Sequence, residues 1–266
     1  MDEITIGYLS WKRHDILKQT LESHRNNGLF NIIPPSNRMI FYQEISDADL
    51  AIADEYGLQV YGSDSNIGIN GGFMDLVRRC KTKYFIFCEN DWMLIEDEKV
   101  CREMLEDCTA LLDQEDNCVV RLRHRREPGV PLYSRPSDVN EWLKNGSNGC
   151  PYKLESLSWL DYPCCRYTPG ILTEHRGKHI WYMTTLDHQK WSNNVFIAST
   201  EWLKNILLPL VEEFQDVDKY SGLESILIDF NQHMGKTTDV DRLIENYKNV
   251  RLGAGDGLFT HQDRLV

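Results

Sequence analysis

Several features are missing from this sequence of 266 residues, and each absence excludes a class of protein. No apolar run approaches the roughly 18 residues of a membrane-spanning helix, so no membrane span is expected. Positive charge is scarce, with 29 Lys and Arg against 41 Asp and Glu and a net charge of −12. Such a surface repels phosphate backbones and anionic membranes, so nucleic acid is not an expected partner.

A disulfide framework and a zinc-binding pattern are also missing, although the chain has 8 cysteines. No C-x-x-C pair occurs, and the adjacent Cys164 and Cys165 lack the spacing of zinc ligands. The first residues, from Met1 to Ile4, are acidic and enter a strand-like run at once, unlike a secretion signal. We therefore expect reduced thiols in a soluble, unsecreted protein of the cytoplasm, or of the host cytoplasm if the source is a virus.

Strand-like and helical segments alternate through the first half of the chain. Strands are expected at 4–9, 39–42, 58–61 and 83–88, with helices at 14–26, after Ser46 and before Cys80. This alternation is typical of βαβ units and predicts an α/β fold with a mostly parallel sheet flanked by helices. The second half is less regular, and no long element is expected from His124 to about Tyr182. The glycine-rich segment 253–257 is expected to be a flexible tail that leads to His261.

Polar and charged residues follow each of the predicted strands. They are Ser10-Trp11, Gln43-Glu44, Ser63-Asp64 and Glu89-Asn90-Asp91. Because the carboxyl ends of parallel strands meet at one edge of a sheet, one ligand could touch all four groups.

The tripeptide Glu89-Asn90-Asp91 is the strongest chemical feature. Two carboxylates one residue apart can hold a hard divalent cation, which would bridge the phosphates of a nucleotide. We assign direct coordination to Asp91 and a supporting role, toward ribose or a metal-bound water, to Glu89. A solvated acidic turn explains the tripeptide alone equally well.

A glycine-rich turn, from Asn66 to Gly72, precedes the third helix and contains Gly68, Asn70 and Gly71. It could bring backbone N–H groups and a helix N-terminus close to phosphate or ribose. It has neither the G-x-G-x-x-G order of dinucleotide binders nor the Gly-Lys-Ser/Thr of a P-loop, so those families are disfavoured.

Three features of the second half have both a chemical and a structural interpretation. Glu224 could act as a general base, but a capping box with Ser221 explains it without catalysis and is favoured on spacing. His261 could complete a metal site begun by Asp91, although a lone surface histidine is more frequent. A basic patch could meet pyrophosphate or an acidic acceptor, or be solvated; it comprises Arg121, Arg123, Arg125 and Arg126.

Together these segments resemble the GT-A glycosyltransferases, whose marks occur in the expected chain order. The similar segments are Ile4–Trp11 (first donor-binding strand), Asn66–Gly72 (glycine loop), Phe87–Trp92 (D-x-D motif in its E-x-D form), Gly222–Glu224 (x-E-D element) and His261 (C-terminal metal histidine). The final acid of the x-E-D element is missing, because Ser225 follows Glu224.

The resemblance implies a GT-A-like, Rossmann-type fold with an irregular acceptor-side region. It implies a single domain, 1–266, in which 1–123 binds the nucleotide-sugar donor and 124–266 binds the acceptor and carries the catalytic base. Mn²⁺ or Mg²⁺ would bind Asp91 and His261, and Glu224 would be the base of an inverting transfer. Donor-binding residues would be Ser10, Trp11, Arg13, Gln43, Glu44, Asn66, Gly68, Asn70, Gly71, Glu89 and Asn90.

The expected function is therefore transfer of a sugar from a nucleoside diphosphate sugar, UDP-linked by preference and GDP-linked second, to a hydroxyl of a glycan or a protein-linked sugar. Gln43 or Glu44 would read the nucleotide base. Retaining transfer is the mechanistic alternative. A nucleotidyltransferase is disfavoured, since no glycine follows the first strand, and a non-catalytic sugar-binding module is the remaining alternative.

Overall fold

The computed structural model describes residues 1–114, 116–124, 173–186, 191, 193–214 and 238–262. The first half contains β1 (Ile4–Trp11), α1 (His14–Asn26), α2 (Leu29–Ile32), η1 (Pro35–Asn37), β2 (Arg38–Gln43), α3 (Asp47–Tyr56), β3 (Gln59–Ser63), α4 (Gly68–Arg79), β4 (Tyr84–Glu89), β5 (Trp92–Leu94), α5 (Glu98–Leu112) and β6 (Asn117–Arg123). The second half contains β7 (Thr173–Arg176), β8 (Ile180–Thr185), β9 (Phe196–Ser199), α9 (Thr200–Trp202), η4 (Leu203–Leu207), α10 (Leu208–Phe214), α13 (Thr238–Asn249) and β10 (Arg251–His261).

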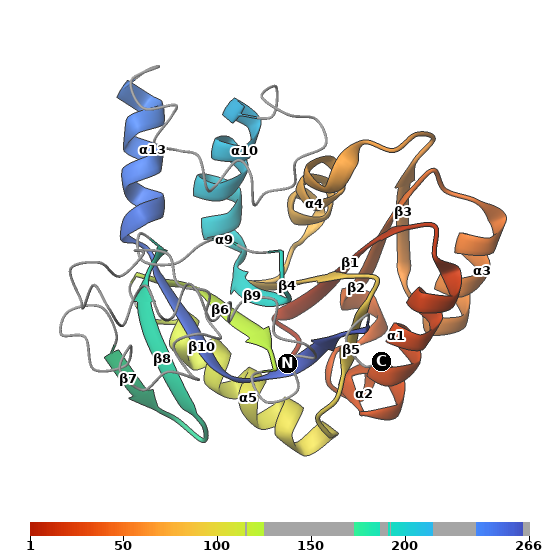
Figure 1. Ribbon diagram of the computed structural model, residues 1–266, viewed down its shortest axis with the longest axis horizontal. Coiled ribbons are helices and arrows are strands. Elements are labelled where there is room, and N and C mark those ends of the chain that lie inside the picture. Colours follow the sequence, from red (N-terminus) through yellow and green to blue (C-terminus); the bar gives the residue numbers. More distant parts are fainter. Residues whose placement is uncertain (115, 125–172, 187–190, 192, 215–237, 263–266) are drawn as a thin grey trace, which may run out of the picture.

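The strands form a single sheet in the order β3-β2-β1-β4-β9-β6-β10-β8-β7, with β5 paired to β10 (Figure 1). Pairing is parallel from β3 through β2 and β1 to β4, and again between β6 and β10. The predicted α/β class is confirmed. The predicted division at residue 123 stays a prediction, although β9 from the second half lies between β4 and β6 in the same sheet.

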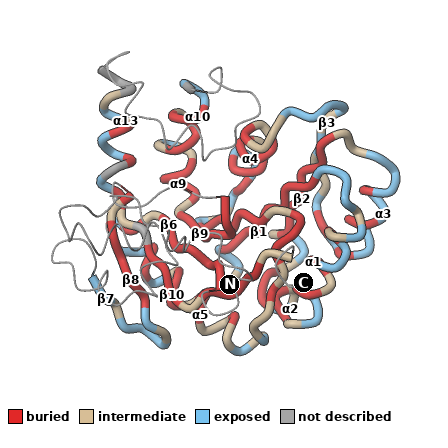
Figure 2. The backbone as a smooth tube through the Cα atoms, in the orientation of Figure 1, coloured by how far each residue is buried: buried red, intermediate tan, exposed pale blue. Residues whose placement is uncertain are grey.

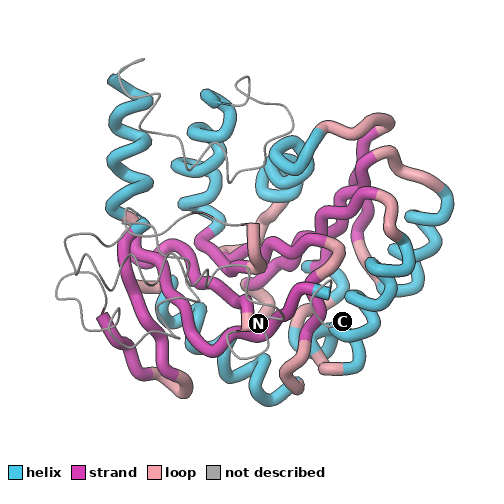
Figure 3. Tube along the Cα trace, viewed as in Figure 1, coloured by secondary structure: helices cyan, strands magenta, loops and turns pink. Residues whose placement is uncertain are grey.

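Helices cover both faces of the sheet, as Figure 3 shows. Alternate strand residues point to opposite faces, so each strand supplies two cores. Phe41, Phe87 and Phe196 pack beneath α4 and α10, while Tyr8 and Ile86 pack beneath α1 and α5. The central strands β1, β2, β4, β6 and β9 are buried between these layers, whereas the edge strands β3 and β7 are not (Figure 2). None of the described helices is long and apolar enough to cross a membrane.

Local sequence signals account for the ends of α3. Ser46 accepts a hydrogen bond from the backbone N–H of Asp49, and the Asp49 carboxylate accepts one from the backbone of Ser46, which makes a capping box. Gly57 ends the helix with φ 64°, a left-handed conformation that glycine adopts without a Cβ penalty. The helix predicted after Ser46 is confirmed.

The glycine-rich segment 253–257 differs from the prediction, because it is part of strand β10 rather than a flexible tail. Its glycines are needed for close packing. A Cβ at Gly255 would lie 2.7 Å from the ring of Trp181, and one at Gly257 would lie 2.0 Å from the carbonyl oxygen of Arg123. The glycines therefore let β10 fit between β6 and β8 in the sheet.

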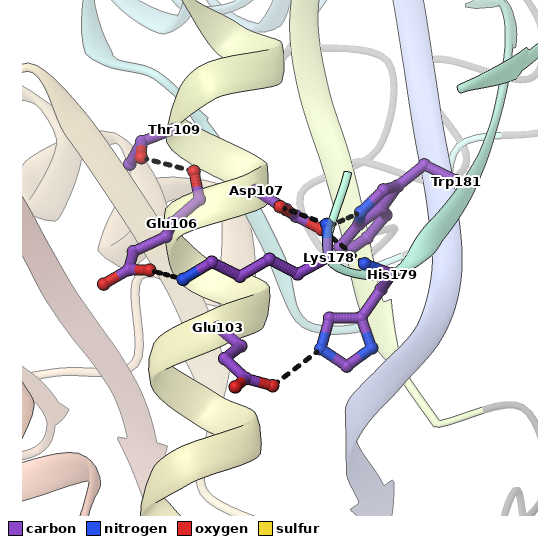
Figure 4. A network of polar contacts seen from close by, with 7 residues as sticks. All are labelled: Glu103, Glu106, Asp107, Thr109, Lys178, His179 and Trp181. Atoms are coloured by element: carbon purple, nitrogen blue, oxygen red, sulfur yellow. Dashed lines mark hydrogen bonds and ion pairs between the residues drawn. The ribbon is translucent and has the colours of Figure 1, made fainter. Parts of the chain in front are cut away.

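The predicted irregular stretch also ends earlier than expected, since β7 and β8 form an antiparallel hairpin. The carboxylate of Asp107, on α5, receives hydrogen bonds from the backbone N–H groups of Lys178 (3.0 Å) and His179 (2.8 Å) and from the indole of Trp181 (3.0 Å), as Figure 4 shows. Burial acts to raise the pKa of Asp107, but these three hydrogen bonds outweigh it and hold that pKa below its usual value. An ionised Asp107 thus attaches the turn of the hairpin to α5.

Polar side chains of α1 bind the free edge of β5, whose other edge pairs with β10. Thr20 donates to the carbonyl of Asn90 (3.0 Å) and Asn27 donates to the carbonyl of Leu94 (2.7 Å). His24 Nε2 lies 2.9 Å from the carbonyl of Trp92. The segment that follows β4 is therefore held on both sides.

The tautomer of His24 follows from its partners. A carbonyl only accepts, so Nε2 carries the proton toward Trp92 and Nδ1 accepts the hydrogen bond from the Tyr8 hydroxyl at 2.7 Å. Burial lowers the pKa of His24 to about 4, despite its hydrogen bond to the Trp92 carbonyl. His24 is neutral in the folded protein across the neutral range of pH.

We expect the free energy of unfolding to fall as the pH drops from about 6.5 to about 4, because the unfolded state then binds a proton at His24 that the folded state excludes. The shift corresponds to about 3 kcal/mol, and its effect levels off below pH 4. Urea unfolding of the wild type and of His24→Gln at several pH values measures it. The variant is less stable at pH 7 but has the flatter profile over this window; parallel profiles would show that another group carries the dependence.

Candidate functional site

A pocket of about 380 Å³ lies where β1, β2 and β4 end and α4 begins. Its lining residues are Leu9, Ser10, Trp11, Arg13, Gln43, Asn66, Gly68, Ile69, Glu89, Asn90 and Asp91. Most of the residues predicted to bind a donor therefore share one pocket. Leu9 and Ile69, which also line it, have no signal in the sequence beyond their place in a strand and a helix.

Asp91 and His261 lie beside each other although 170 positions separate them. The antiparallel pairing of β5 with β10 sets His261 opposite Trp92, and His261 Nε2 is 3.3 Å from Asp91 Oδ2. The backbone N–H of Gln262 donates to the carbonyl of Asp91 at 2.7 Å. The rings of Trp92 and His261 meet edge to face at 5.2 Å. Strand pairing therefore brings together the two residues predicted to bind metal.

The donor atoms of this pair fit a divalent cation. Asp91 is only 8% exposed, and its Oδ1 is buried without a hydrogen-bond partner among the described residues. The separation of 3.3 Å between Asp91 Oδ2 and His261 Nε2 suits neighbouring ligands, since bonds of about 2.0–2.1 Å place adjacent donors about 3 Å apart. Within the described part of the chain, no three His, Cys, Asp or Glu side chains form a metal-binding group. The described residues would thus supply two ligands, Asp91 and His261.

The loop after β1 holds three consecutive residues against carboxylates from three other places in the chain. Lys12 Nζ is 2.8 Å from Glu44, Arg13 Nη1 is 3.3 Å from Asp91 Oδ2, and His14 Nε2 is 2.9 Å from Asp49. Both Lys12 and Arg13 have φ 55°, as Glu44 has φ 54°, which is uncommon for residues other than glycine. Such left-handed residues cluster at functional sites.

Glu44 lies outside the pocket lining, bound to Lys12. The hydrogen bond from Lys12, aided by others from Trp11 and Asn66, holds the pKa of Glu44 below its usual value. Glu44 is therefore anionic and fixes the position of Lys12. Its predicted contact with a nucleotide base stays a prediction.

Gln43 supports the glycine-rich turn. Its buried amide donates to the carbonyl of Gly68 (2.7 Å) and accepts from the backbone N–H of Ile67 (2.8 Å). Asn66 Oδ1 accepts from the N–H of Gly68 at 2.8 Å, which closes the turn that starts α4. These contacts give Gln43 a positioning role, and its predicted reading of a base also stays a prediction.

Asn70 and Gly71 lie in the first turns of α4, outside the pocket lining. Asn70 is buried, and a Cβ at Gly71 would lie 2.9 Å from the side chain of Ile67. The structure therefore gives Gly71 a packing role in the turn.

The basic patch is only partly described. Arg121 and Arg123 are buried, with their guanidinium groups 5.0 Å from the Trp191 ring and 5.5 Å from the Trp92 ring. The interpretation as a solvated face is therefore wrong for both, because these aromatic rings and the neighbouring strands cover them. Arg125 and Arg126 lie outside the described residues, as does the predicted base Glu224.

Thr20 and His24, which hold the segment after β4, were missed by sequence reasoning. They lie on a helix about 70 positions from their partners, and nothing in a helical pattern marks residues that bind a distant strand.

Comparison with known proteins supports the fold. No protein-family model matches the sequence, and no curated protein matches it either. Among solved structures, S. aureus TarS matches with 13% identity and a TM-score of 0.51, covering 98% of this chain and 36% of TarS. Its 1–349 fragment matches with 14% identity and a TM-score of 0.50, covering 98% and 60%. This chain thus spans less than two thirds of both.

A further match is M. tuberculosis glucosyl-3-phosphoglycerate synthase in complex with Mn²⁺, uridine diphosphate and glucosyl-3-phosphoglycerate. It has 14% identity and a TM-score of 0.47, covering 98% of this chain and 72% of the synthase. The matched structures are GT-A-type glycosyltransferases. The described chain therefore has an α/β fold of the GT-A type.

Proposed function

We propose that this protein is a metal-dependent glycosyltransferase, which moves a sugar from a nucleoside diphosphate sugar to an acceptor hydroxyl. One observation carries the proposal: Asp91 lines a pocket formed by three parallel strand ends and the start of α4, and His261 lies 3.3 Å from its carboxylate. Ligands of open α/β sheets bind beyond the carboxyl ends of the strands, and this pocket lies at three such ends.

The pocket suits a nucleoside diphosphate. The N-terminus of α4 borders it at Gly68 and Ile69, and the partial positive charge there favours an anionic diphosphate. Trp11, which is 47% exposed, offers a ring face to a base or a sugar. Its volume of about 380 Å³ lies within the range of about 300–1,000 Å³ that ligand pockets occupy.

Asp91 and His261 would hold Mn²⁺ or Mg²⁺, a cation that neutralises charge on a departing diphosphate. Glu89 lines the same pocket beside Asn90 and would bind ribose or a water molecule. The hydrogen bonds to the carbonyls of Asn90 and Asp91 hold the backbone from which the Asp91 carboxylate extends.

In the proposed transfer, the acceptor oxygen attacks the anomeric carbon while the bond from that carbon to the diphosphate breaks. Glu224 takes the proton of the acceptor hydroxyl, and the product has inverted configuration. The acceptor would be a glycan or a protein-linked sugar. The anomeric configuration of the product, read by NMR, separates inversion from retention.

The function is tested by thermal-shift measurements with UDP, GDP, CDP, dTDP and ADP, each with and without Mn²⁺. A ligand at a hundred times its dissociation constant stabilises the fold by about 2.7 kcal/mol. We expect UDP to stabilise most, and only with metal. The matching triphosphates are measured in the same way, and stronger stabilisation by one of them would favour a nucleotidyltransferase. No stabilisation by any nucleotide would contradict the donor site and favour a module that binds sugar alone.

A further inference from the structure

Arg13 makes an ion pair with the residue that is proposed to hold the metal. Its Nη1 lies 3.3 Å from Asp91 Oδ2, the same oxygen that His261 Nε2 approaches at 3.3 Å. The Arg13 side chain is 44% exposed and that of Asp91 is 11% exposed. The guanidinium thus comes from the solvent side onto a largely buried carboxylate.

Among the described residues that line the pocket, Arg13 is the only cation, beside the carboxylates of Glu89 and Asp91. A diphosphate brings at least two more negative charges to this pocket. One divalent cation and Arg13 together bring three positive charges against at least four negative ones, and Arg13 can serve the diphosphate only if it turns away from Asp91.

We propose that Arg13 neutralises Asp91 while no metal is bound. When the cation binds Asp91, Arg13 leaves that carboxylate and pairs with the donor diphosphate instead. This proposal rests on the proposed function. A cation on Asp91 Oδ2 would repel a guanidinium 3.3 Å from the same atom. The planar fork of arginine matches two phosphate oxygens, so the released side chain has a partner in the donor.

The exchange is proposed for the Arg13 side chain alone, because both of its neighbours in the chain have carboxylate partners of their own. Lys12 is paired with Glu44, and His14 is paired with the buried Asp49. It follows that Arg13 weakens the binding of metal alone and strengthens the binding of metal together with donor.

The test compares Arg13→Asn with Lys12→Asn. Both residues have φ 55°, a conformation that asparagine tolerates, so both variants should fold. Each removes one positive charge, but only Arg13 contacts Asp91. Mn²⁺ binding without nucleotide is measured by electron paramagnetic resonance, and UDP binding with saturating Mn²⁺ by calorimetry.

We expect Arg13→Asn to bind Mn²⁺ alone about threefold tighter than the wild type, as loss of a partly exposed ion pair implies, and to bind UDP with Mn²⁺ about tenfold more weakly. Lys12→Asn should leave the Mn²⁺ affinity within about twofold of the wild type. The proposal is overturned if Arg13→Asn binds Mn²⁺ no tighter, or if it binds UDP as well as the wild type does. Failure of the proposed function looks different, because the wild type itself would then bind no nucleotide with Mn²⁺.

Discussion

Replacing Asp91 with asparagine is expected to remove the effect of Mn²⁺ on nucleoside diphosphate binding, with a loss in affinity of about 100-fold when metal is present. The amide is a poorer ligand for a cation than the carboxylate, and it brings no negative charge. The backbone contacts from Thr20 to Asn90 and from Gln262 to Asp91 do not use the Asp91 side chain, so the local structure should persist. Calorimetric titrations with and without Mn²⁺ measure the change.

Asp64→Asn is the matched control for this variant. Asp64 follows β3 at the same edge of the sheet, is exposed and lies outside the pocket lining. It should change affinity by less than about twofold, as expected for one screened surface charge. If Asp91→Asn keeps the full response to Mn²⁺, or if both variants lose it equally, Asp91 is not the metal ligand.

Gly257→Ala is expected to destabilise the fold by more than about 3 kcal/mol. Its φ is +83°, and the new Cβ would lie 2.0 Å from the carbonyl oxygen and 2.3 Å from the carbonyl carbon of Arg123. These are backbone atoms of the neighbouring strand, so β10 must move away from β6. Urea unfolding at neutral pH measures the loss.

Gly57→Ala isolates the conformational part of this effect, so the difference between the two variants gives the steric part. Gly57 also has a left-handed φ, +64°, but its new Cβ would meet nothing nearer than Pro35 at 3.9 Å. It should cost only the conformational penalty of about 1–2 kcal/mol. Equal losses of stability in the two variants would mean that β10 can shift without destabilising the fold. That result would contradict the close fit of β10 against β6.

Local sequence patterns were sufficient to predict much of the structure of the first half. The capping box of Ser46 and Asp49 and the glycine after α3 lie within a few residues of the structure that they determine. The strands before Trp11, Gln43 and Glu89 are continuous apolar runs, as expected for strands buried on both faces. Four strands of the first half, β1 to β4, could thus be placed, and the parallel order expected for them made a shared edge with polar residues predictable.

The structure of the second half was harder to predict, because its elements depend on residues that are distant in the chain. The segment 253–257 looks like a flexible tail in the sequence, yet its glycines serve contacts with Trp181 and Arg123, which lie far away in the chain. Arg121 and Arg123 look like a solvated patch, but β9 and the rings of Trp191 and Trp92 cover them. No pattern within β6 distinguishes the two cases.

The sequence by itself determined the α/β class, the acidic residues at the end of β4 and the glycine-rich start of α4, since each depends on neighbouring residues and on the periodicity of strands and helices. The resemblance predicted that Asp91 and His261 share a cation, but only the tertiary structure decided that the pairing of β5 with β10 brings them together. It also decided that Arg13 approaches the same oxygen and that Gln43 supports the turn rather than pointing freely into the pocket. These contacts join residues from 24 to 170 positions apart. Such distances are set by strand order and register, which a single sequence does not encode locally.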